Sequence, residues 1–405
     1  MFLRLSNSAL PASLRQEVIT DAYGVPRYWA TVWSTMCLND VARSTREKKL
    51  RYIDSLYSHG DLNFGANALD TAIGRFNEPD LQEILESWLV SIVNRPTQTM
   101  SDEARWRTGL EFVSTVLLWL TKTAPKEKKV YALQDTVHRL SNLYGQLHVT
   151  GPRKVIGVRS LPSDVVEELY NIVDPLSTKN PFPRERTRWL VYTCFIILLH
   201  QGLRRGELLL LPADAVKSEF DRTSSRVRSW INVDTNPYED ESTDPRYSRP
   251  GIKTAPSVRQ IPVSTTVADI VQTYVENFRG RPDHAYLVNS QHQLPLSTES
   301  LTKMFSKLSS ALPSPLIKAL SDRTGRTSVT PHDLRHTCAV VRLHQLLRQG
   351  DPMDEAIQNL RSFFGWSRES TMPLRYARAV FEDRLMKVWT ARFDSQIELI
   401  RSIDR

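Results

Sequence analysis

Two histidines lie one helical turn apart in the segment TPHDLRHTCAVVRLH, which begins at Thr330. They are His332 and His336, and Arg335 stands between them. Histidines at this spacing, with Asp333 after the first one, are typical of a helix that binds zinc in a hydrolase. The arginine indicates the opposite, because a guanidinium group repels a dication and binds a phosphate through two parallel hydrogen bonds. The segment therefore indicates either a metal site or a phosphate site.

Three other segments contain residues that suit a phosphate site. GLRRGELLLL contains Arg204 and Glu207, GIKTAPSVRQIP contains Lys253, and FFGWSRESTMPLRYARA contains Trp366 and Tyr376. A protein that breaks and reseals a DNA strand without a nucleotide cofactor must conserve the bond energy in a covalent ester, and tyrosine is a competent nucleophile for that step. The sequence has no Gly-x-x-x-x-Gly-Lys-Ser/Thr loop for ATP, so we expect no cofactor and, with a phosphate site, no metal.

In this order, the segments resemble the catalytic domain of the tyrosine recombinases, the phage integrase family. The family pattern is Gly-x-Arg-x-x-Glu-Leu, a hairpin lysine, His-x-x-Arg-His, and then Gly-His or Gly-Trp followed by a tyrosine. The resemblance covers about residues 156–385. It implies a 3'-phosphotyrosine intermediate and a free 5'-hydroxyl group. One departure is that Tyr376 follows Trp366 by ten residues, one more than is usual in the family.

The resemblance also implies a role for the two arginines. Arg204 and Arg335 would bind the non-bridging oxygens of the scissile phosphate, where negative charge develops in the transition state. Glu207, three residues after Arg204, would orient the arginines rather than take part in the chemistry.

The remaining implied roles concern the tyrosine. Tyr376 would be the nucleophile, and His332 would assist proton transfer at its hydroxyl group. Trp366 would donate its indole N–H group to a phosphate oxygen. His336, on the same helix face as His332, would be a supporting hydrogen-bonding group.

Three lysines compete for one further role. Lys253, at the tip of a predicted hairpin, is the candidate to protonate the departing 5'-oxygen. Lys303 and Lys307 lie in a predicted helix, STESLTKMFSKLSSAL. They are alternative candidates for this role and also candidates for contacts with DNA.

A basic helix face is predicted near the N-terminus. STREKKLRYIDSLY begins with a Ser-x-x-Glu pattern, so we expect Ser44 and Glu47 to cap a helix there. The apolar face of that helix would contain Leu50, Ile53 and Tyr57. The opposite face is a candidate DNA-binding surface that contains Arg46, Lys48, Lys49 and Arg51.

We expect a mainly α fold with two domains. Residues 1–155 would be a helical DNA-binding region similar to the family's core-binding domain, and residues 156–405 the catalytic domain. Gly and Pro interrupt the helical pattern at 148–160, which predicts the linker. By resemblance, the two domains would form a C-shaped clamp around DNA.

Within residues 156–405 the pattern is mostly helical. Ser163 and Asp164 form a cap signal for one helix, and Asp351 is the expected cap of another, with Pro352 at its first helical position. A buried helix should end at Gly202. A strand at 226–235 and a hairpin within 247–264 would form a small antiparallel sheet. A last helix, from Phe381, is a candidate for docking on a neighbouring protomer.

Composition narrows the class of protein. The chain has 405 residues and a formal net charge of +8, which suits a polyanionic partner such as double-stranded DNA with a specific site. Three widely spaced cysteines fit a reducing compartment. We find no signal peptide and no apolar run of the ~20 residues that a membrane span needs. We expect a cytoplasmic, nucleoid-associated bacterial protein that acts as a tetramer, with partner recombinases or DNA-bending proteins as possible accessories.

The sequence leaves several alternatives open. A member of the same fold that binds DNA without cutting it, or that cuts only with a partner, would share much of the pattern. A type IB topoisomerase would use the same chemistry without strand exchange. A zinc hydrolase built on His332 and His336 lacks an evident third ligand. Integration, excision, transposition and resolution are not distinguished.

Overall fold

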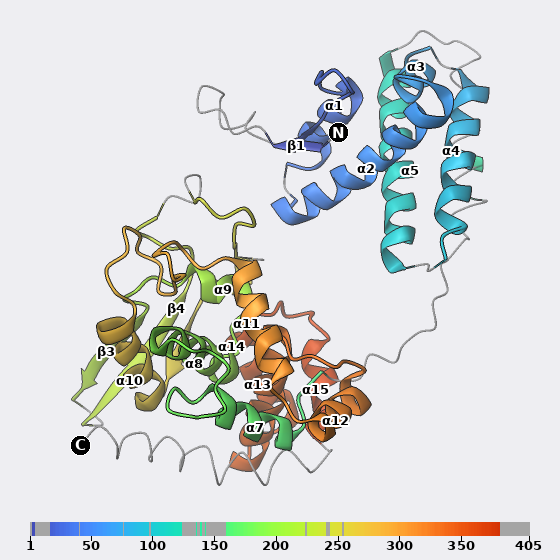
Figure 1. The fold of residues 1–405 in the computed structure, drawn as a ribbon. Helices are drawn as coiled ribbons and strands as arrows, with labels where there is room; N and C mark the ends of the chain where they lie inside the picture. The colour runs from blue at the N-terminus through green and yellow to red at the C-terminus, as the bar shows by residue number, and fades with distance from the viewer. Residues whose placement is uncertain are drawn as a thin grey trace. The chain divides into compact units, whose positions relative to one another are not determined.

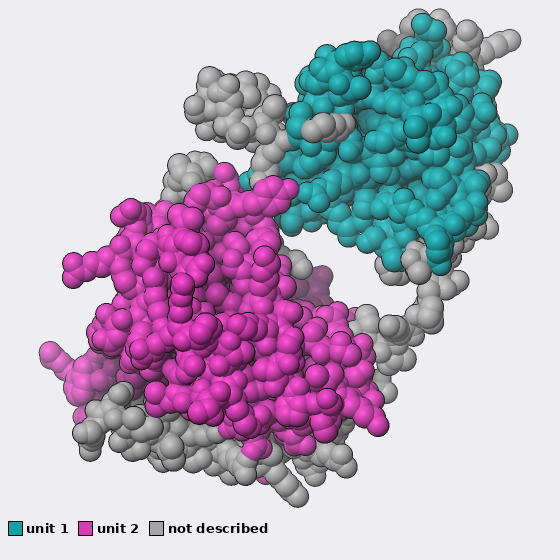
Figure 2. All heavy atoms as spheres, viewed as in Figure 1, with its two compact units in different colours: residues 1–154 teal, residues 155–405 magenta. Residues whose placement is uncertain are grey.

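A computed structural model of the chain describes residues 2–4, 17–39, 41–75, 77–96, 99–123, 135, 138, 139, 142, 159–222, 225–239, 244–252 and 255–380. The chain divides into two compact units, residues 1–154 and 155–405, which are coloured separately in Figure 2. Both units are mostly helical, and the second contains a small antiparallel sheet, as the sequence predicted (Figure 1). Of the predicted linker, 148–160, residues 148–158 lie outside the described residues.

The first unit is a helical bundle with one short strand pair. Its helices are α1 (Tyr28–Cys37), α2 (Arg43–Phe64), α3 (Ala68–Gly74), α4 (Glu78–Val93) and α5 (Met100–Thr123). Strands β1 (Phe2–Arg4) and β2 (Glu17–Ile19) pair antiparallel. The predicted apolar face of α2 is confirmed, because Leu50, Ile53 and Tyr57 are buried. The strand pair was not predicted, since three residues are too few to show an alternating pattern.

The predicted capping box at Ser44 and Glu47 is wrong. Helix α2 begins two residues earlier than that cap requires, at Arg43, and its N-cap residue, Ala42, has no side-chain cap. Glu47 instead accepts a hydrogen bond from Nε of Arg43, at 3.2 Å, one turn back on the same helix. This ion pair holds the carboxylate on the helix surface, where it cannot cap the backbone.

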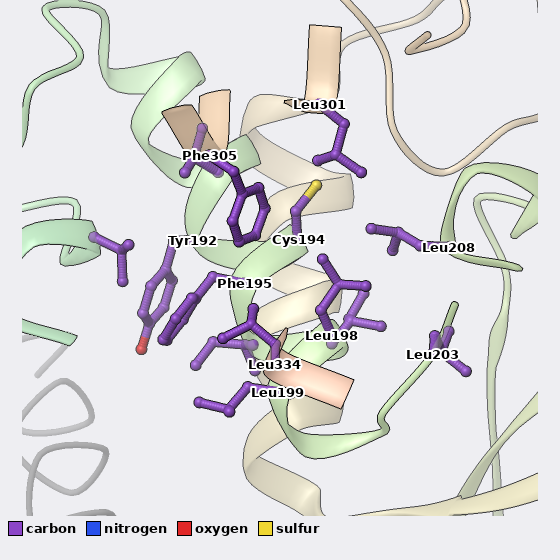
Figure 3. Packing of buried hydrophobic residues seen from close by; sticks show 14 of the residues in the cluster. Tyr192, Cys194, Phe195, Leu198, Leu199, Leu203, Leu208, Leu301, Phe305 and Leu334 are labelled. Atoms are coloured by element: carbon purple, nitrogen blue, oxygen red, sulfur yellow. The ribbon is translucent and has the colours of Figure 1, made fainter. Parts of the chain in front are cut away.

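The helices of the second unit surround a buried helix, α8. They are α7 (Ser163–Val173), α8 (Glu185–His200), α9 (Arg205–Leu210), α10 (Thr265–Thr273), α11 (Thr298–Ser310), α12 (Ser314–Thr324), α13 (Pro331–Gln349), α14 (Met353–Phe364) and α15 (Met372–Val380). Figure 3 shows α8 side chains packed against leucines and a phenylalanine of other elements. The prediction of a buried helix is confirmed, and the turn after it uses Gly202 with a φ of +57°.

The sheet of the second unit has three antiparallel strands in the order β3 (Val216–Asp221), β4 (Arg226–Val233), β5 (Arg259–Val263). The predicted strand at 226–235 is confirmed as β4. The predicted hairpin within 247–264 is wrong: residues 247–252 form no strand, and β5 pairs with β4 instead. Lys253, placed at the tip of that hairpin, lies outside the described residues.

Two further predicted caps are wrong for one shared reason. Helices α7 and α14 begin after Pro162 and Pro352, which are themselves the N-cap residues and offer no capping side chain. Ser163 therefore lies inside the first turn of α7, and Asp351 lies before the cap of α14.

Candidate active site

The start of α13 is held by its own side chains. The N-cap residue, Thr330, donates hydrogen bonds from its backbone N–H and its hydroxyl group to Oδ2 of Asp333, at 2.8 and 2.6 Å. Pro331 occupies the first helical position, where its fixed φ suits a helix start. His332, Arg335 and His336 follow in the first two turns, so this cap fixes the helix end that presents them.

The chain before α7 is attached to the same helix. Nε of Arg159 donates to Oδ1 of Asp333 at 2.9 Å, and two residues later the N–H of Leu161 donates to Oγ1 of Thr337, also at 2.9 Å. Ser160, between them, is buried. The two contacts lie one helical turn apart along α13, so residues 159–161 run against its first turns.

Tyr376 lies on α15, which packs against α13 (Figure 1). Its side chain is 2% exposed, and its hydroxyl oxygen is 2.8 Å from Nδ1 of His336. Burial raises the pKa of the tyrosine above its usual value. Burial, together with the neighbouring His332 and arginines, lowers the pKa of His336 to about 3. At pH 7 the imidazole is therefore neutral, and its Nδ1 can accept the hydrogen bond from the tyrosine hydroxyl group.

His332 occupies a different place from the one that the sequence suggested. It is exposed, and its ring lies edge-on to that of His336, with 4.4 Å between the ring centroids. Desolvation by the surrounding protein and the charge of Arg159 lower its pKa to about 4. We expected His332 to contact the tyrosine and His336 to support it, but the hydrogen bond to Tyr376 is made by His336.

Trp366 lies in a stack of aromatic rings. Its ring is 4.7 Å from Phe364 and 5.5 Å from Tyr376, with interplanar angles of 13° and 15°. The guanidinium carbon of Arg335 lies 5.6 Å from the Trp366 ring and 4.9 Å from Phe364. The indole therefore stacks on the tyrosine ring and also lies within cation–π distance of Arg335.

Glu207 joins three arginines. Its carboxylate accepts hydrogen bonds from Nη1 of Arg204, at 2.5 Å, and from Nη2 of Arg259, at 3.1 Å, and Nη1 of Arg335 lies 3.7 Å away. Burial alone would raise the pKa of Glu207, but the charges of Arg259, Arg335 and Arg204 outweigh it and hold the pKa below its usual value. An ionised carboxylate thus compensates a cluster of three positive charges.

The two arginines of the predicted phosphate clamp have different surroundings. Arg335 is 3% exposed, and it donates from Nη1 to the carbonyl of Gly202, at 2.6 Å, and from Nη2 to that of Phe364, at 2.7 Å. Arg204 is 23% exposed. Arg204 therefore offers the more accessible guanidinium group, while Arg335 ties three segments of the chain together.

Lys303 and Lys307 are exposed residues of α11. Nζ of Lys307 lies 5.0 Å from the centre of the Phe182 ring. Helix α11 adjoins the start of α9 through a hydrogen bond of 3.1 Å from Nη1 of Arg205 to Oγ1 of Thr302. These lysines therefore belong to an element next to Arg204, and Lys253 is not placed.

The predicted basic face of α2 is not uniform. Nε of Arg46 lies 3.2 Å from a carboxylate oxygen of Glu17, and Nζ of Lys49 lies 2.9 Å from a carboxylate of α5. Lys48 and Arg51 are exposed. Of the four residues, these two present the more accessible charge on this face.

No role was predicted from the sequence for three residues of the site: Arg159, Ser257 and Arg259. A signal existed for Arg259, which precedes Ile261 and Val263 on the core-facing side of β5, where an arginine indicates a buried ion pair. Arg159 lies before α7 and Ser257 lies in a 3-10 turn before β5, and neither residue type nor spacing distinguished them.

The described residues offer no group of three or more His, Cys, Asp or Glu side chains that could hold a metal ion. Within the same part of the chain, no helix has the length and apolar character that crossing a membrane requires.

The family model for the phage integrase family matches residues 159–383. The chain belongs to the phage integrase family. The matched range contains every residue of the candidate active site described above. No curated protein matches the chain.

Among solved structures, the family member is similar to "Crystal structure of XerA recombinase", with 14% identity over 88% of this chain and 97% of that one and a TM-score of 0.34. It is also similar to the XerH site-specific recombinase bound to palindromic difH substrate, in a post-cleavage complex. The identity there is 12% over 90% of this chain and 85% of that one, with a TM-score of 0.49.

Proposed function

We propose that this tyrosine recombinase is a site-specific DNA recombinase that cuts and rejoins strands through a covalent bond between Tyr376 and the 3'-phosphate of DNA. The hydrogen bond between the Tyr376 hydroxyl group and His336 is the observation that carries the proposal. It pairs a nucleophile with a neutral base beside a cluster of arginines, which is the arrangement that phosphoryl transfer to a tyrosine needs.

The chemical step balances with these residues. The phenolic oxygen of Tyr376 attacks phosphorus while its proton passes to Nδ1 of His336. The new O–P bond forms as the bond from phosphorus to the 5'-oxygen breaks, and Arg204 and Arg335 stabilise the charge on the non-bridging oxygens. The 5'-oxygen takes up a proton, for which Lys253 stays the candidate donor. Attack by a 5'-hydroxyl group of the partner strand reverses these events and reseals the DNA.

The remaining assignments extend this proposal to the whole chain. The first unit would grip the recombination site, in part through Lys48 and Arg51. Four protomers would form the synapse, because each site cuts one strand. The protein would act in the bacterial cytoplasm on the nucleoid, in integration, excision or transposition of a mobile element, with accessory DNA-bending proteins where direction is controlled.

A second candidate is a member that cleaves only with a partner recombinase. The burial of Tyr376 and the two carbonyl contacts of Arg335 favour it, because both side chains must be exposed to a phosphate before cleavage.

The test uses a pool of nicked DNA duplexes with random sequence around the nick, so that the released fragment diffuses away and the adduct persists. Wild-type protein should form a covalent adduct that survives denaturing gels, and sequencing the bound DNA would give the site. Tyr376→Phe should form none. Tyr274→Phe is the matched control, because this buried tyrosine donates to Asn289 far from α15 in the sequence.

An adduct that persists in Tyr376→Phe would exclude this nucleophile. Wild-type protein that binds DNA without forming an adduct would exclude autonomous cleavage and leave the partner-dependent candidate. Relaxation of supercoiled plasmid without strand exchange would indicate a topoisomerase instead.

A further inference from the structure

Ser257 lies between two arginines of the site. It is fully buried, in a 3-10 turn at Ala255–Ser257 just before β5. Its hydroxyl oxygen accepts a hydrogen bond of 2.7 Å from Nη1 of Arg204, and its carbonyl oxygen accepts one of 2.6 Å from Nη1 of Arg259. The side chain of Ser257 therefore contacts Arg204, which is partly exposed, and its backbone contacts Arg259, which is buried.

The backbone of Ser257 is held by Arg259 rather than by Arg204. Besides its bond to the Ser257 carbonyl, Arg259 donates from Nε to the carbonyl of Phe363, at 2.7 Å, and from Nη2 to Glu207, at 3.1 Å. These contacts tie the turn to α14 and to α9. The hydroxyl group of Ser257 is thus a preplaced acceptor rather than one that follows the arginine.

Two acceptors occupy one end of the Arg204 guanidinium group. Nη1 carries two N–H groups, and it donates to Oε1 of Glu207 and to Oγ of Ser257. The N–H groups on Nε and Nη2 have no hydrogen-bond partner among the residues that the structure describes. That edge is the one that can bind two phosphate oxygens at once.

We infer that Ser257 is a positioning residue, which holds the guanidinium group of Arg204 so that its Nε and Nη2 edge faces the scissile phosphate. The inference rests on the proposed function and adds a residue that supports transition-state stabilisation without touching DNA. Glu207 alone would leave the guanidinium plane free to turn about one contact, and the second acceptor removes that freedom.

The first test measures adduct formation on a nicked duplex recovered from the random pool. Ser257→Ala keeps the backbone carbonyl that Arg259 binds, and we expect it to slow adduct formation about tenfold, as for the loss of one hydrogen bond to a charged group. Ser229→Ala is the matched control, because this buried serine bonds Ser218 within the sheet, at 2.7 Å. The control should form adduct at the wild-type rate.

The next comparison separates positioning of Arg204 from general loss of structure. A methylphosphonate at the scissile position has a methyl group in place of one non-bridging oxygen and carries no negative charge, so it has little need of a guanidinium group. On that substrate the defect of Ser257→Ala should shrink to less than about twofold, and in an Arg204→Ala background Ser257→Ala should add no further loss. A defect that persists on the methylphosphonate, or that adds to Arg204→Ala, would overturn the inference.

A last measurement does not depend on cleavage. Phenylglyoxal modifies accessible guanidinium groups, and peptide mass spectrometry can follow Arg204 and its exposed neighbour Arg205 separately. We expect Ser257→Ala to speed modification of Arg204 several-fold and to leave Arg205 unchanged. If Ser257→Ala leaves the reactivity of Arg204 unchanged, the inference is overturned, whether or not the wild-type protein forms an adduct. A wild-type protein that forms no adduct contradicts only autonomous cleavage.

Discussion

Gly365 lies so close to Pro256 that a Cβ atom on the glycine would come 2.7 Å from the proline carbonyl oxygen. The glycine ends α14 with a φ of +60°, directly before Trp366. Two features therefore favour glycine here, a left-handed backbone and a close backbone approach. Because Pro256 adjoins Ser257 and Gly365 adjoins Trp366, the turn before β5 and the end of α14 are packed together at this point.

We expect Gly365→Ala to destabilise the protein by about 3 kcal/mol or more, because the backbone strain of ~1–2 kcal/mol adds to the clash. Gly325→Ala is the matched control, since Gly325 ends α12 with a φ of +68° and has open space around it. It should cost only the backbone strain. Urea unfolding of both variants measures the difference, and equal losses would contradict the close approach.

Stability should fall in mild acid because of His336. Its pKa is about 3 in the folded protein, against an ordinary value of 6.5, so below pH 6.5 the unfolded chain binds a proton that the folded protein does not. Between pH 7.5 and pH 5 this residue should cost about 2 kcal/mol of unfolding free energy. His336→Asn should therefore show a weaker dependence on pH than wild type in urea titrations. Parallel curves for the two proteins would show that His336 is not held neutral.

Substitutions of Trp366 should separate packing from donation by the indole. Trp366→Phe keeps a ring between Phe364 and Tyr376, so its stability should lie within about 1.5 kcal/mol of wild type. Trp366→Ala removes the ring that packs on the tyrosine and should cost about 2–3 kcal/mol, because the indole is only partly buried. Thermal unfolding measures these losses of stability. The adduct assay tests donation by the indole: if Trp366→Phe folds normally but forms the adduct about tenfold more slowly, the N–H group contacts the phosphate.

The salt dependence of DNA binding should depend on Lys48 and Arg51 more than on Lys49. Each phosphate contact releases counterions, so Lys48→Gln together with Arg51→Gln should reduce the slope of log K against log salt by roughly 1.8. Lys49→Gln is the control, because Lys49 already pairs with Glu111. Fluorescence anisotropy with a labelled duplex gives the slopes. A double variant with the wild-type slope would place the DNA elsewhere.

Long amphipathic helices were predictable because burial imposes a repeated spacing over many residues. The apolar face of α2 is an example, and α8 was predictable for the related reason that it is apolar on nearly every side. Helix caps and short strands were not, because one local contact decides each of them. Arg43 competes for Glu47, prolines occupy two N-cap positions, and β5 pairs with a strand far away in sequence instead of forming a hairpin.

The sequence predicted which residues belong to the candidate site better than it predicted the contacts between them. The order of motifs located Arg204, Glu207, Arg335 and Tyr376, which the structure brings together with His336 and Trp366. Which histidine faces the tyrosine depends on how α15 packs against α13, and no spacing in the sequence encodes that. The roles of Ser257 and Arg159 depend on contacts between segments that are distant in the chain.

The attachment of residues 159–161 to α13 has a mechanical consequence. The backbone enters the catalytic unit through two contacts with this helix, at Asp333 and Thr337. A force on residues 159–161 would therefore act on the helix that presents His332, Arg335 and His336. It would act at the same time on α12, because Nε of Arg323 donates a hydrogen bond to the carbonyl of Ser160, at 3.2 Å.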